Sequence, residues 1–162
     1  MVKLLWRRLD GENGHTAGRA LLRQLYEETF SRPMPEILTT DRGKPYFIDN
    51  SCHFSISHSK NHAFCVISDK NIAIDAEETD RPIRLALAEK MLSDNEKAIF
   101  DTAEDPRLTL LKFWVLKEAA AKLSGFGLHG CPDKSDFSPE HPGLSIIDGC
   151  IVAVLQEESY AF

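Results

Sequence analysis

The sequence predicts a mixed α+β fold built around an antiparallel sheet. The centre of the chain, from residue 53 to residue 77, is rich in apolar and alternating segments that are typical of strands. Residues 108–124 carry the strongest helical periodicity in the chain. Near the end, two short apolar segments are joined by Asp148-Gly149, a dipeptide that favours a tight hairpin turn. Because hairpins join antiparallel strands, we expect antiparallel pairing.

The N-terminal part predicts a strand, a helix and a short apolar segment. Residues 2–9 suit an opening strand. Apolar residues recur at helical spacing over residues 17–30, and Pro33 ends this helix because proline has no backbone N–H. A polar turn over residues 39–44 then leads into the apolar segment 45–48.

Three strands are expected in the centre, over residues 53–57, 63–68 and 71–77. The third alternates apolar and polar residues, as a strand with two different faces does. Asp69-Lys70-Asn71 predicts a tight hairpin between the last two of these strands.

Helices are expected next. Two shorter ones cover residues 83–91 and 94–101, and Ser93 is a natural N-cap for the second. The long helix ends at Gly125 and Gly127, since glycine readily adopts the left-handed conformation that closes a helix.

The C-terminal part predicts a loop and a closing hairpin. Residues 131–143 are rich in proline and charge, which is typical of a loop. Residues 145–147 and 150–156 form the two strands of the hairpin. No internal repeat is visible in the sequence.

The composition indicates one globular unit, or two small halves that share a core. The chain has 162 residues, of which 43% are hydrophobic and 27% are charged. Its apolar runs are too short to cross a bilayer, and no apolar leader segment follows the first residues. We therefore expect a cytoplasmic protein with no membrane partner.

The charge limits the classes of ligand. The formal net charge is −6, which argues against a protein that binds nucleic acid over its whole surface. An anionic small molecule would need a local basic pocket on this background.

The four cysteines are Cys52, Cys65, Cys131 and Cys150. None forms a C-x-x-C pair, and the chain is not short and cysteine-dense. We expect free, mostly buried thiols rather than a disulfide framework.

The first candidate site is the segment Ile-Ala-Ile-Asp-Ala-Glu at residues 72–77. In a strand, Asp75 and Glu77 point to the same face. Two neighbouring carboxylates repel unless a cation lies between them, and carboxylate oxygens suit Mg²⁺. The alternative is a solvated face of an edge strand.

The second candidate site lies on the long helix. Trp114, Glu118 and Lys122 are spaced by four residues and therefore share one stripe. A carboxylate and a lysine beside a large aromatic side chain indicate a metal–phosphate site on a partly buried face. The alternative is a simple surface ion pair between Glu118 and Lys122.

The third candidate is the segment Phe-Ser-Ile-Ser-His-Ser, in which Ser57, His58 and Ser59 offer several hydrogen-bond donors for phosphate oxygens. Two alternatives stay open. His53, His58 and His62 could bind zinc, although no cysteine or carboxylate completes the set. A serine–histidine nucleophile pair would lack a nucleophile elbow and an orienting acid.

Taken in order, these segments closely resemble the 4′-phosphopantetheinyl transferase superfamily, in particular its larger surfactin-synthetase-activator type. The resemblance covers residues 19–128, and fewer residues precede it than in that type. The segments that carry it are Gly43-Lys44-Pro45, residues 54–59, residues 72–77, and residues 113–122 followed by Gly125-Phe126-Gly127-Leu128.

The resemblance implies an enzyme that transfers 4′-phosphopantetheine from coenzyme A to a serine of an apo acyl or peptidyl carrier protein, with Mg²⁺, releasing 3′,5′-ADP. It also implies a fold of two pseudo-symmetric α+β halves with the active site between them. We place the halves at residues 1–50 and 51–162 of one compact unit. Because both halves lie in this chain, we expect a monomer.

The resemblance also implies site residues. Asp75, Glu77 and Glu118 match the three acids that hold the metal ion. Lys122 matches a lysine on the pyrophosphate, and Lys117 lies in the same motif. Glu118 and Lys122 therefore count as catalytic residues.

The remaining matches concern the cofactor and the base. Ser57 and His58 match residues on the nucleotide phosphates. The turn of Lys44 and Pro45 matches the one that holds the adenine, and Arg19 matches an arginine near the 3′-phosphate. Glu96 lies where the proposed catalytic base of the family lies; the alternative is an exposed helix glutamate.

The chain departs from the family pattern at two small positions. Ala73 replaces the usual glycine, and Ala76 replaces the usual valine or isoleucine between the acids. The shorter N-terminus leaves a second hypothesis open, a non-catalytic module that binds coenzyme A or a carrier protein. A third, a plain interaction domain, would make all of these motif matches coincidental.

Overall fold

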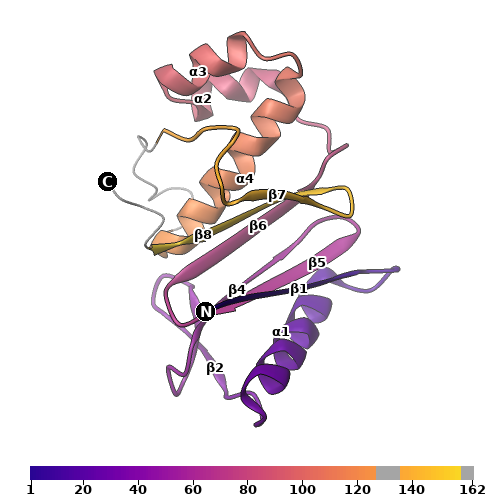
Figure 1. Ribbon diagram of the computed structural model, residues 1–162, viewed down its shortest axis with the longest axis vertical. Coiled ribbons are helices and arrows are strands. Elements are labelled where there is room, and N and C mark those ends of the chain that lie inside the picture. Colours follow the sequence, from indigo (N-terminus) through magenta and orange to yellow (C-terminus); the bar gives the residue numbers. More distant parts are fainter. Residues whose placement is uncertain (127–135, 158–162) are drawn as a thin grey trace.

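Two three-stranded antiparallel sheets lie against each other between two long helices (Figure 1). The computed structural model describes residues 1–126 and 136–157. The first sheet has the strand order β1-β5-β4, and the second has the order β6-β8-β7. The bounds of the first sheet are β1 (Val2–Arg8), β4 (His53–His58) and β5 (His62–Ser68), and those of the second are β6 (Ile72–Glu78), β7 (Leu144–Ile147) and β8 (Cys150–Gln156). The predicted α+β class is thereby confirmed.

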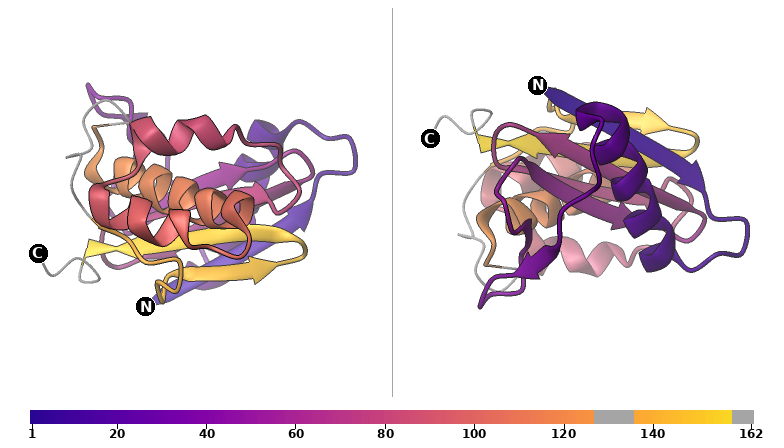
Figure 2. Two further views of the ribbon diagram at one scale, coloured as in Figure 1. Left: turned by 90° about the horizontal axis from the view of Figure 1, so that it is seen from above. Right: turned by 90° about the horizontal axis from the view of Figure 1, so that it is seen from below.

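One helix covers the outer face of each sheet. Helix α1 (Gly14–Phe30) packs on the first sheet, and α4 (Pro106–Ser124) packs on the second. The short helices η1 (Leu85–Leu87), α2 (Ala88–Met91) and α3 (Asp94–Asp101) precede α4, and α2 and α3 lie beside it on its outer side (Figure 2). A small two-stranded sheet of β2 (Ile37–Thr39) and β3 (Pro45–Phe47) follows α1.

The strand alternation determines which side chains each layer receives. On β6, Ile72 and Ile74 join the apolar layer between the sheets, whereas Ala73 joins the layer beneath α4. Residues at odd positions of β6 therefore face α4. Asp75 and Glu77 belong to this face.

Local signals explain the helix ends. Asn13 caps α1 by accepting a hydrogen bond from the Thr16 backbone N–H, and Ser93 caps α3 as expected. Helix α4 ends at Gly125, which has a φ of 72° and so takes the left-handed conformation that glycine tolerates best. Gly127 and residues 131–135 of the expected loop lie outside the described residues.

The hairpin expected at Asp69-Lys70-Asn71 is wrong. Strand β5 pairs with β1 on one side and β4 on the other, so neither edge is free for β6. Strand β6 pairs with β8 instead. The segment between β5 and β6 therefore carries the chain from the first sheet to the second, whereas the closing hairpin of β7 and β8 is confirmed.

The division of the chain into halves at residues 1–50 and 51–162 stays a prediction. Strand pairing shows which strands a boundary between halves would separate. Strands β4 and β5 follow residue 50 and share a sheet with β1. The first sheet therefore extends to Ser68. None of the helices in the described part of the chain has the length and apolar character needed to span a bilayer.

Three serines, which we call the serine ladder, join the neighbouring edges of the two sheets. The Ser55 hydroxyl accepts a hydrogen bond from the Ile74 backbone N–H at 3.1 Å. The Ser57 hydroxyl accepts one from the Ala76 N–H at 3.1 Å. The Ser59 hydroxyl donates to the Glu78 carboxylate at 2.7 Å. Side chains of β4 thus satisfy edge N–H groups of β6 that no neighbouring strand pairs with.

Replacing Ser55 should destabilise the fold. Ser55→Ala leaves the Ile74 N–H buried and unpaired, so we expect the free energy of unfolding to fall by about 1–3 kcal/mol. Urea denaturation measures this loss. Ser145→Ala on the exposed face of β7 is the matched control and should change stability little; equal effects of both substitutions would contradict the ladder.

Candidate active site

Three carboxylates meet where β6 faces α4. Asp75 and Glu77 of β6 and Glu118 of α4 line one pocket of about 310 Å³, together with Trp114 and Lys122. The strand alternation places the two strand acids on the α4 side, and the four-residue helical spacing turns Glu118 and Lys122 towards them. The structure therefore places the three expected metal ligands around one pocket.

Asp75 is the most buried of these acids, with 7% of its surface exposed. Its Oδ1 accepts hydrogen bonds from Lys122 Nζ at 2.8 Å and from the Ser57 hydroxyl at 3.2 Å. Its Oδ2 is buried and has no hydrogen-bond partner among the described residues. A buried carboxylate oxygen without a partner is costly, so this atom suits a ligand position for a cation.

The other two acids are held in an unfavourable electrostatic environment. Burial, and then the charge of Asp75, raise the pKa of Glu118. Burial also raises the pKa of Glu77, although Arg81 pairs with Glu77 and lies 5.3 Å from the centre of the Trp114 ring. Carboxylates that resist ionisation in this way fit a divalent cation, whose charge would favour the ionised form.

A second pocket of about 370 Å³ lies beside the carboxylates and is rich in cationic side chains. Among its lining residues are the expected Arg19, Lys44, Pro45, His58 and Lys122. His58 and Lys122 line both pockets, so the two pockets are neighbours. This basic pocket is what an acidic chain needs in order to bind an anion.

Lys44 connects two distant parts of this pocket. Its Nζ donates to Asn71 Oδ1 at 2.5 Å and to the Leu123 carbonyl at 3.0 Å. Burial lowers the pKa of Lys44. The turn that precedes β3 is thus tied to the last turn of α4.

Two lining residues were missed by the sequence reasoning, His15 and Arg42. The Arg42 guanidinium lies 3.7 Å from the centre of the Phe126 ring. Arg42 stands just before the Gly-Lys-Pro turn, so its place in that motif could have indicated it. His15 lies in the first turn of α1, and only the packing of α1 on the first sheet brings it here.

Close packing of α1 positions His58. A Cβ atom at Gly14 would lie 2.6 Å from His58 Cγ, and one at Gly18 would lie 2.5 Å from Ile56 Cγ2. Both glycines are therefore needed for α1 to approach β4, and the His58 ring rests directly against the start of the helix.

Ser57 takes part both in the contact between the two sheets and in the carboxylate pocket. It lines the carboxylate pocket but has only 5% of its surface exposed. Its hydroxyl is shared between the Ala76 N–H and Asp75. In this structure it orients a carboxylate.

The structure does not bring Glu96 and Lys117 into either pocket. Glu96 is fully buried, and its carboxylate accepts hydrogen bonds from the Ser93 and Phe137 backbone N–H groups, both at 2.9 Å. Lys117 Nζ pairs with this same carboxylate at 2.9 Å. Because every contact of Glu96 is structural, the geometry gives no support to its role as a base.

The three-histidine zinc site is also not formed. His53 and His58 are exposed on β4, whereas His62 is buried on β5. Among the described residues, the side chains that cluster as metal donors around His62 are Glu78 and Cys150.

The fold and the two pockets define a protein that places a basic anion-binding pocket next to a carboxylate cluster suited to a divalent cation. Comparison with known proteins then identifies the relatives. The model of a family described as the 4'-phosphopantetheinyl transferase superfamily matches residues 71–147.

Two curated proteins show the same relationship. The chain is 30% identical over 116 residues to the 4'-phosphopantetheinyl transferase gsp of Aneurinibacillus migulanus, a match that covers 69% of this chain and 48% of that protein. It is 30% identical over 100 residues to a putative 4'-phosphopantetheinyl transferase of Haemophilus influenzae, with 59% and 43% covered. The chain is related to the 4′-phosphopantetheinyl transferase superfamily, which confirms the resemblance, and spans about half the length of the curated relatives it matches.

The raised pKa of Glu118 predicts a pH dependence of stability. The pKa of Glu118 in the folded state lies above its ordinary value of 4.5. Protonated Glu118 therefore stabilises the folded state fully below pH 4.5, and this stabilisation is lost as pH rises through the folded-state pKa. Glu118→Gln should therefore reduce the fall in melting temperature with rising pH and should stabilise the metal-free protein at neutral pH. Thermal denaturation in chelator, between about pH 4 and pH 8, measures this.

The matched control is Glu104→Gln, which changes an exposed glutamate before α4. It should leave the pH profile of the melting temperature unchanged. A Glu118→Gln profile identical to that of the parent chain would mean that Glu118 is ionised without cost in the folded state.

Proposed function

We propose that the protein transfers the phosphopantetheine arm of coenzyme A to a serine of an apo acyl or peptidyl carrier protein, with Mg²⁺ as cofactor. The observation that carries this proposal is the junction of the two pockets. Asp75, Glu77 and Glu118 adjoin a basic pocket, and Lys122 lines both. A substrate with a pyrophosphate and a further phosphate matches this distribution of charge.

The basic pocket would hold the nucleotide end of coenzyme A. Arg19, Arg42 and His15 line it and can donate to phosphate oxygens. The Lys44 and Pro45 turn lines the same pocket close to the end of α4, where a flat adenine could lie.

The carboxylate pocket would hold the reacting pyrophosphate. A Mg²⁺ ion on Asp75, Glu77 and Glu118 would neutralise the negative charge of that pyrophosphate. Lys122 contacts Asp75 Oδ1 at 2.8 Å and would stabilise charge on the leaving group.

The transfer forms one phosphorus–oxygen bond and breaks another. The serine oxygen of the carrier protein bonds to the phosphorus of the phosphopantetheine arm, and the bond from that phosphorus to 3′,5′-ADP breaks. The serine proton is lost. Since Glu96 is enclosed by structural contacts, we propose that solvent water at the open pocket receives the proton.

The arrangement of the sheets supports a single chain as the working unit. In chain order, the first strand of each sheet pairs with the third, and the second strand lies at an edge of the sheet. A helix covers the outer face of each sheet. We propose that the two sheets with their helices are pseudo-symmetric halves and that the cofactor lies between them. Residues of both halves line the basic pocket, which supports a monomer.

The reaction can be tested on an apo acyl carrier protein with coenzyme A and Mg²⁺. We expect its intact mass to increase by one phosphopantetheine arm, and we expect chelator to prevent the increase. Asp75→Asn and Glu118→Gln should abolish transfer, because each removes a charge at the metal without a change of size. Glu104→Gln is the control and should retain the parent rate.

The same experiment separates the two leading hypotheses. Coenzyme A binding without transfer to carriers of several pathways would favour the non-catalytic binding module.

The role of Arg42 is tested by coenzyme A affinity. Arg42→Ala removes a cation of the basic pocket, so the dissociation constant measured by calorimetry should rise roughly 10- to 100-fold, as expected for a lost charge-assisted hydrogen bond. Arg84→Ala changes an exposed arginine before η1 and should leave the dissociation constant unchanged. Equal affinities of the Arg42 and Arg84 variants would remove Arg42 from the site.

A further inference from the structure

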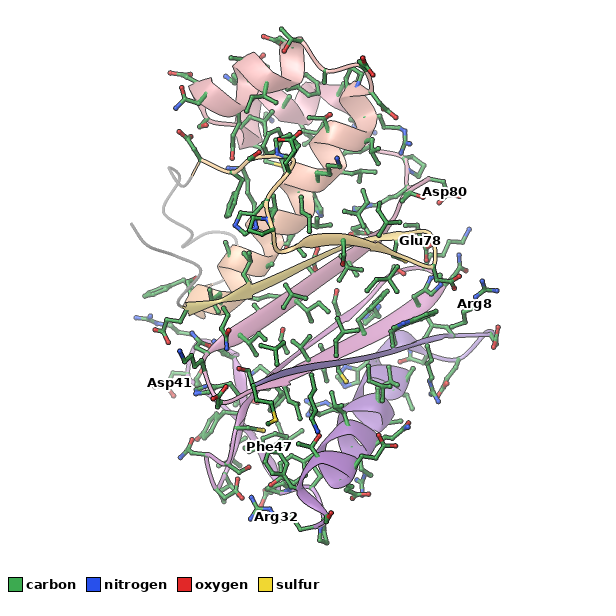
Figure 3. The ribbon with its side chains drawn as sticks, in the orientation of Figure 1. Arg8, Arg32, Asp41, Phe47, Glu78 and Asp80 are labelled. Carbon is green, nitrogen blue, oxygen red and sulfur yellow. The ribbon has the colours of Figure 1, made fainter. Side chains whose placement is uncertain are left out.

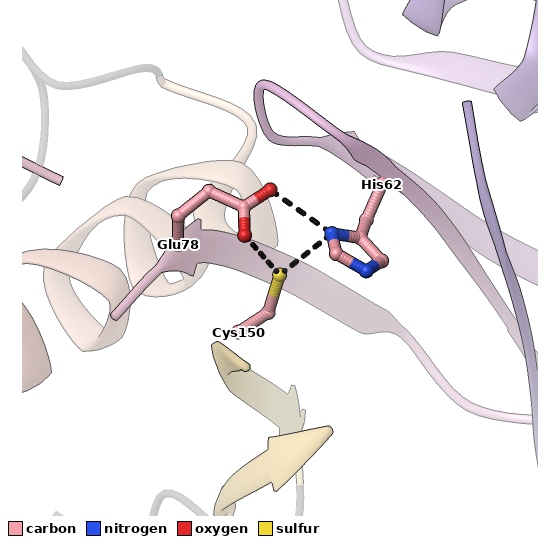
Figure 4. A group of neighbouring side chains, drawn as sticks. All are labelled: His62, Glu78 and Cys150. Atoms are coloured by element: carbon pink, nitrogen blue, oxygen red, sulfur yellow. Dashed lines mark hydrogen bonds and ion pairs between the residues drawn. The ribbon is translucent and has the colours of Figure 1, made fainter. Parts of the chain in front are cut away.

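A second cluster of donor side chains lies at another rim of the two sheets. It contains His62 of β5, Glu78 of β6 and Cys150 of β8 (Figure 4). His62 Nδ1 lies 2.9 Å from Glu78 Oε1 and 3.2 Å from Cys150 Sγ, and Cys150 Sγ lies 3.4 Å from Glu78 Oε2. All three ligand atoms lie within 4.8 Å of one another.

Strand register brings these residues together. Glu78 stands directly opposite Cys150 in the β6–β8 ladder, so their side chains project from the same face. Cys150 belongs to the apolar layer between the sheets. His62 begins β5 and reaches this layer from the first sheet. Figure 3 shows Glu78 and Arg8 on the same side of the molecule.

The cluster is distinct from the carboxylate pocket. Glu78 follows Glu77 on β6 and therefore points to the opposite face of the strand. The proposed transfer uses none of these three side chains. Their burial is also unusual for polar groups, since His62 has 5% and Glu78 has 8% of its surface exposed.

Further contacts fix the orientation of the donors. The other ring nitrogen of His62, Nε2, lies 2.9 Å from Asp148 Oδ2, and Arg8 holds Asp148 through two contacts at 2.6 and 2.8 Å. Ser59 donates to Glu78 Oε1 at 2.7 Å. A carboxylate on the far nitrogen of a histidine is the arrangement that orients histidine ligands in zinc sites.

We propose that His62 Nδ1, Glu78 and Cys150 Sγ form a binding site for Zn²⁺ that joins the two sheets. Nitrogen, oxygen and sulfur donors in a tetrahedral zinc site lie roughly 3.3–3.6 Å apart, given the usual zinc–ligand bond lengths. The imidazole and thiol donors lie 3.2 Å apart, and a different Glu78 oxygen lies near each of them, at 2.9 Å from Nδ1 and 3.4 Å from Sγ, so a small expansion and a turn of the carboxylate would admit the ion.

Access and charge also suit this ion. A pocket of about 580 Å³ is lined by Ser59 and Glu78, and the ion would enter past Glu78 from this side. On binding, the thiol proton of Cys150 and any proton on His62 Nδ1 leave to solvent, so the ion is held by one thiolate, one carboxylate and one neutral imidazole. A thiolate donor favours zinc over Mg²⁺, which prefers oxygen ligands.

A reactive thiol is the weaker interpretation of the same cluster. Burial, together with the neighbouring Glu78, raises the pKa of Cys150 to about 12. A thiol held in its protonated form is a poor nucleophile. Metal binding remains the function that uses all three side chains.

The test uses the full chain after removal of metal by chelator, with Mg²⁺ in excess to occupy the carboxylate pocket. We expect about one Zn²⁺ per chain by metal analysis after dialysis, and a higher melting temperature with Zn²⁺, because an ion that binds only the folded state stabilises it. Co²⁺ should give a near-ultraviolet sulfur-to-cobalt absorption band, which reports the thiolate ligand directly in the parent chain.

The variants assign the site. Cys150→Ser and His62→Gln should lose the Zn²⁺-dependent rise in melting temperature and the cobalt band. Cys65→Ala, at a buried cysteine of β5 in the core between α1 and the first sheet, is the matched control and should retain both. Glu118→Gln should also retain both, which separates this site from the proposed active site.

Two results would overturn the proposal. One is a parent chain that takes up no zinc and shows no cobalt band, which would make the cluster a hydrogen-bonded network only. The other is a cobalt band that persists in Cys150→Ser. Because the parent spectrum requires no variant to fold, the first result is decisive even if a substitution destabilises the chain.

Discussion

The hydrogen bonds of the serine ladder are the interaction on which the rest of the structure depends. The edge N–H groups of β6 face β4, yet the two strands belong to different sheets. The Ser55 and Ser57 hydroxyls accept from N–H groups 19 residues further along the chain, and this constant offset fixes one register between the sheets. Without such partners, an edge strand would keep unpaired groups that favour association with another chain.

The ladder also connects the fold to its chemistry. Ser57 accepts from the Ala76 N–H and donates to Asp75 Oδ1, so the residue that sets the register also orients a carboxylate. One step further, Ser59 contacts Glu78 of the second cluster. Alternate residues of β6 therefore face two different sites, and the position of each site depends on the same edge contacts.

The sequence predicted features that depend on neighbouring residues within one strand or helix. It predicted less well the contacts between elements that lie far apart in the chain. Strand alternation was enough to put Asp75 and Glu77 on one face, and helical spacing was enough to put Glu118 and Lys122 on one stripe. That the strand and the helix share one pocket came from the family resemblance and not from these local patterns. The pairing of β5 was not predictable in this way, because the choice between β6 and β1 depends on residues far away in the chain. For Glu96, a local signal was present: Ser93 and Glu96 have the spacing of a capping box, which is the contact they make.

The contacts of Lys44 have a consequence for the order of folding. Its bond to the Leu123 carbonyl joins residues 79 positions apart, and the bond from Asn71 to the same carbonyl spans 52 positions. Contacts of such separation are entropically costly, because the intervening chain must be ordered for them to be made. The walls of the basic pocket therefore come from segments that meet only where the two halves of the chain pack together. A partly folded chain has no such pocket, so occupancy of this pocket is a property of the completed fold alone.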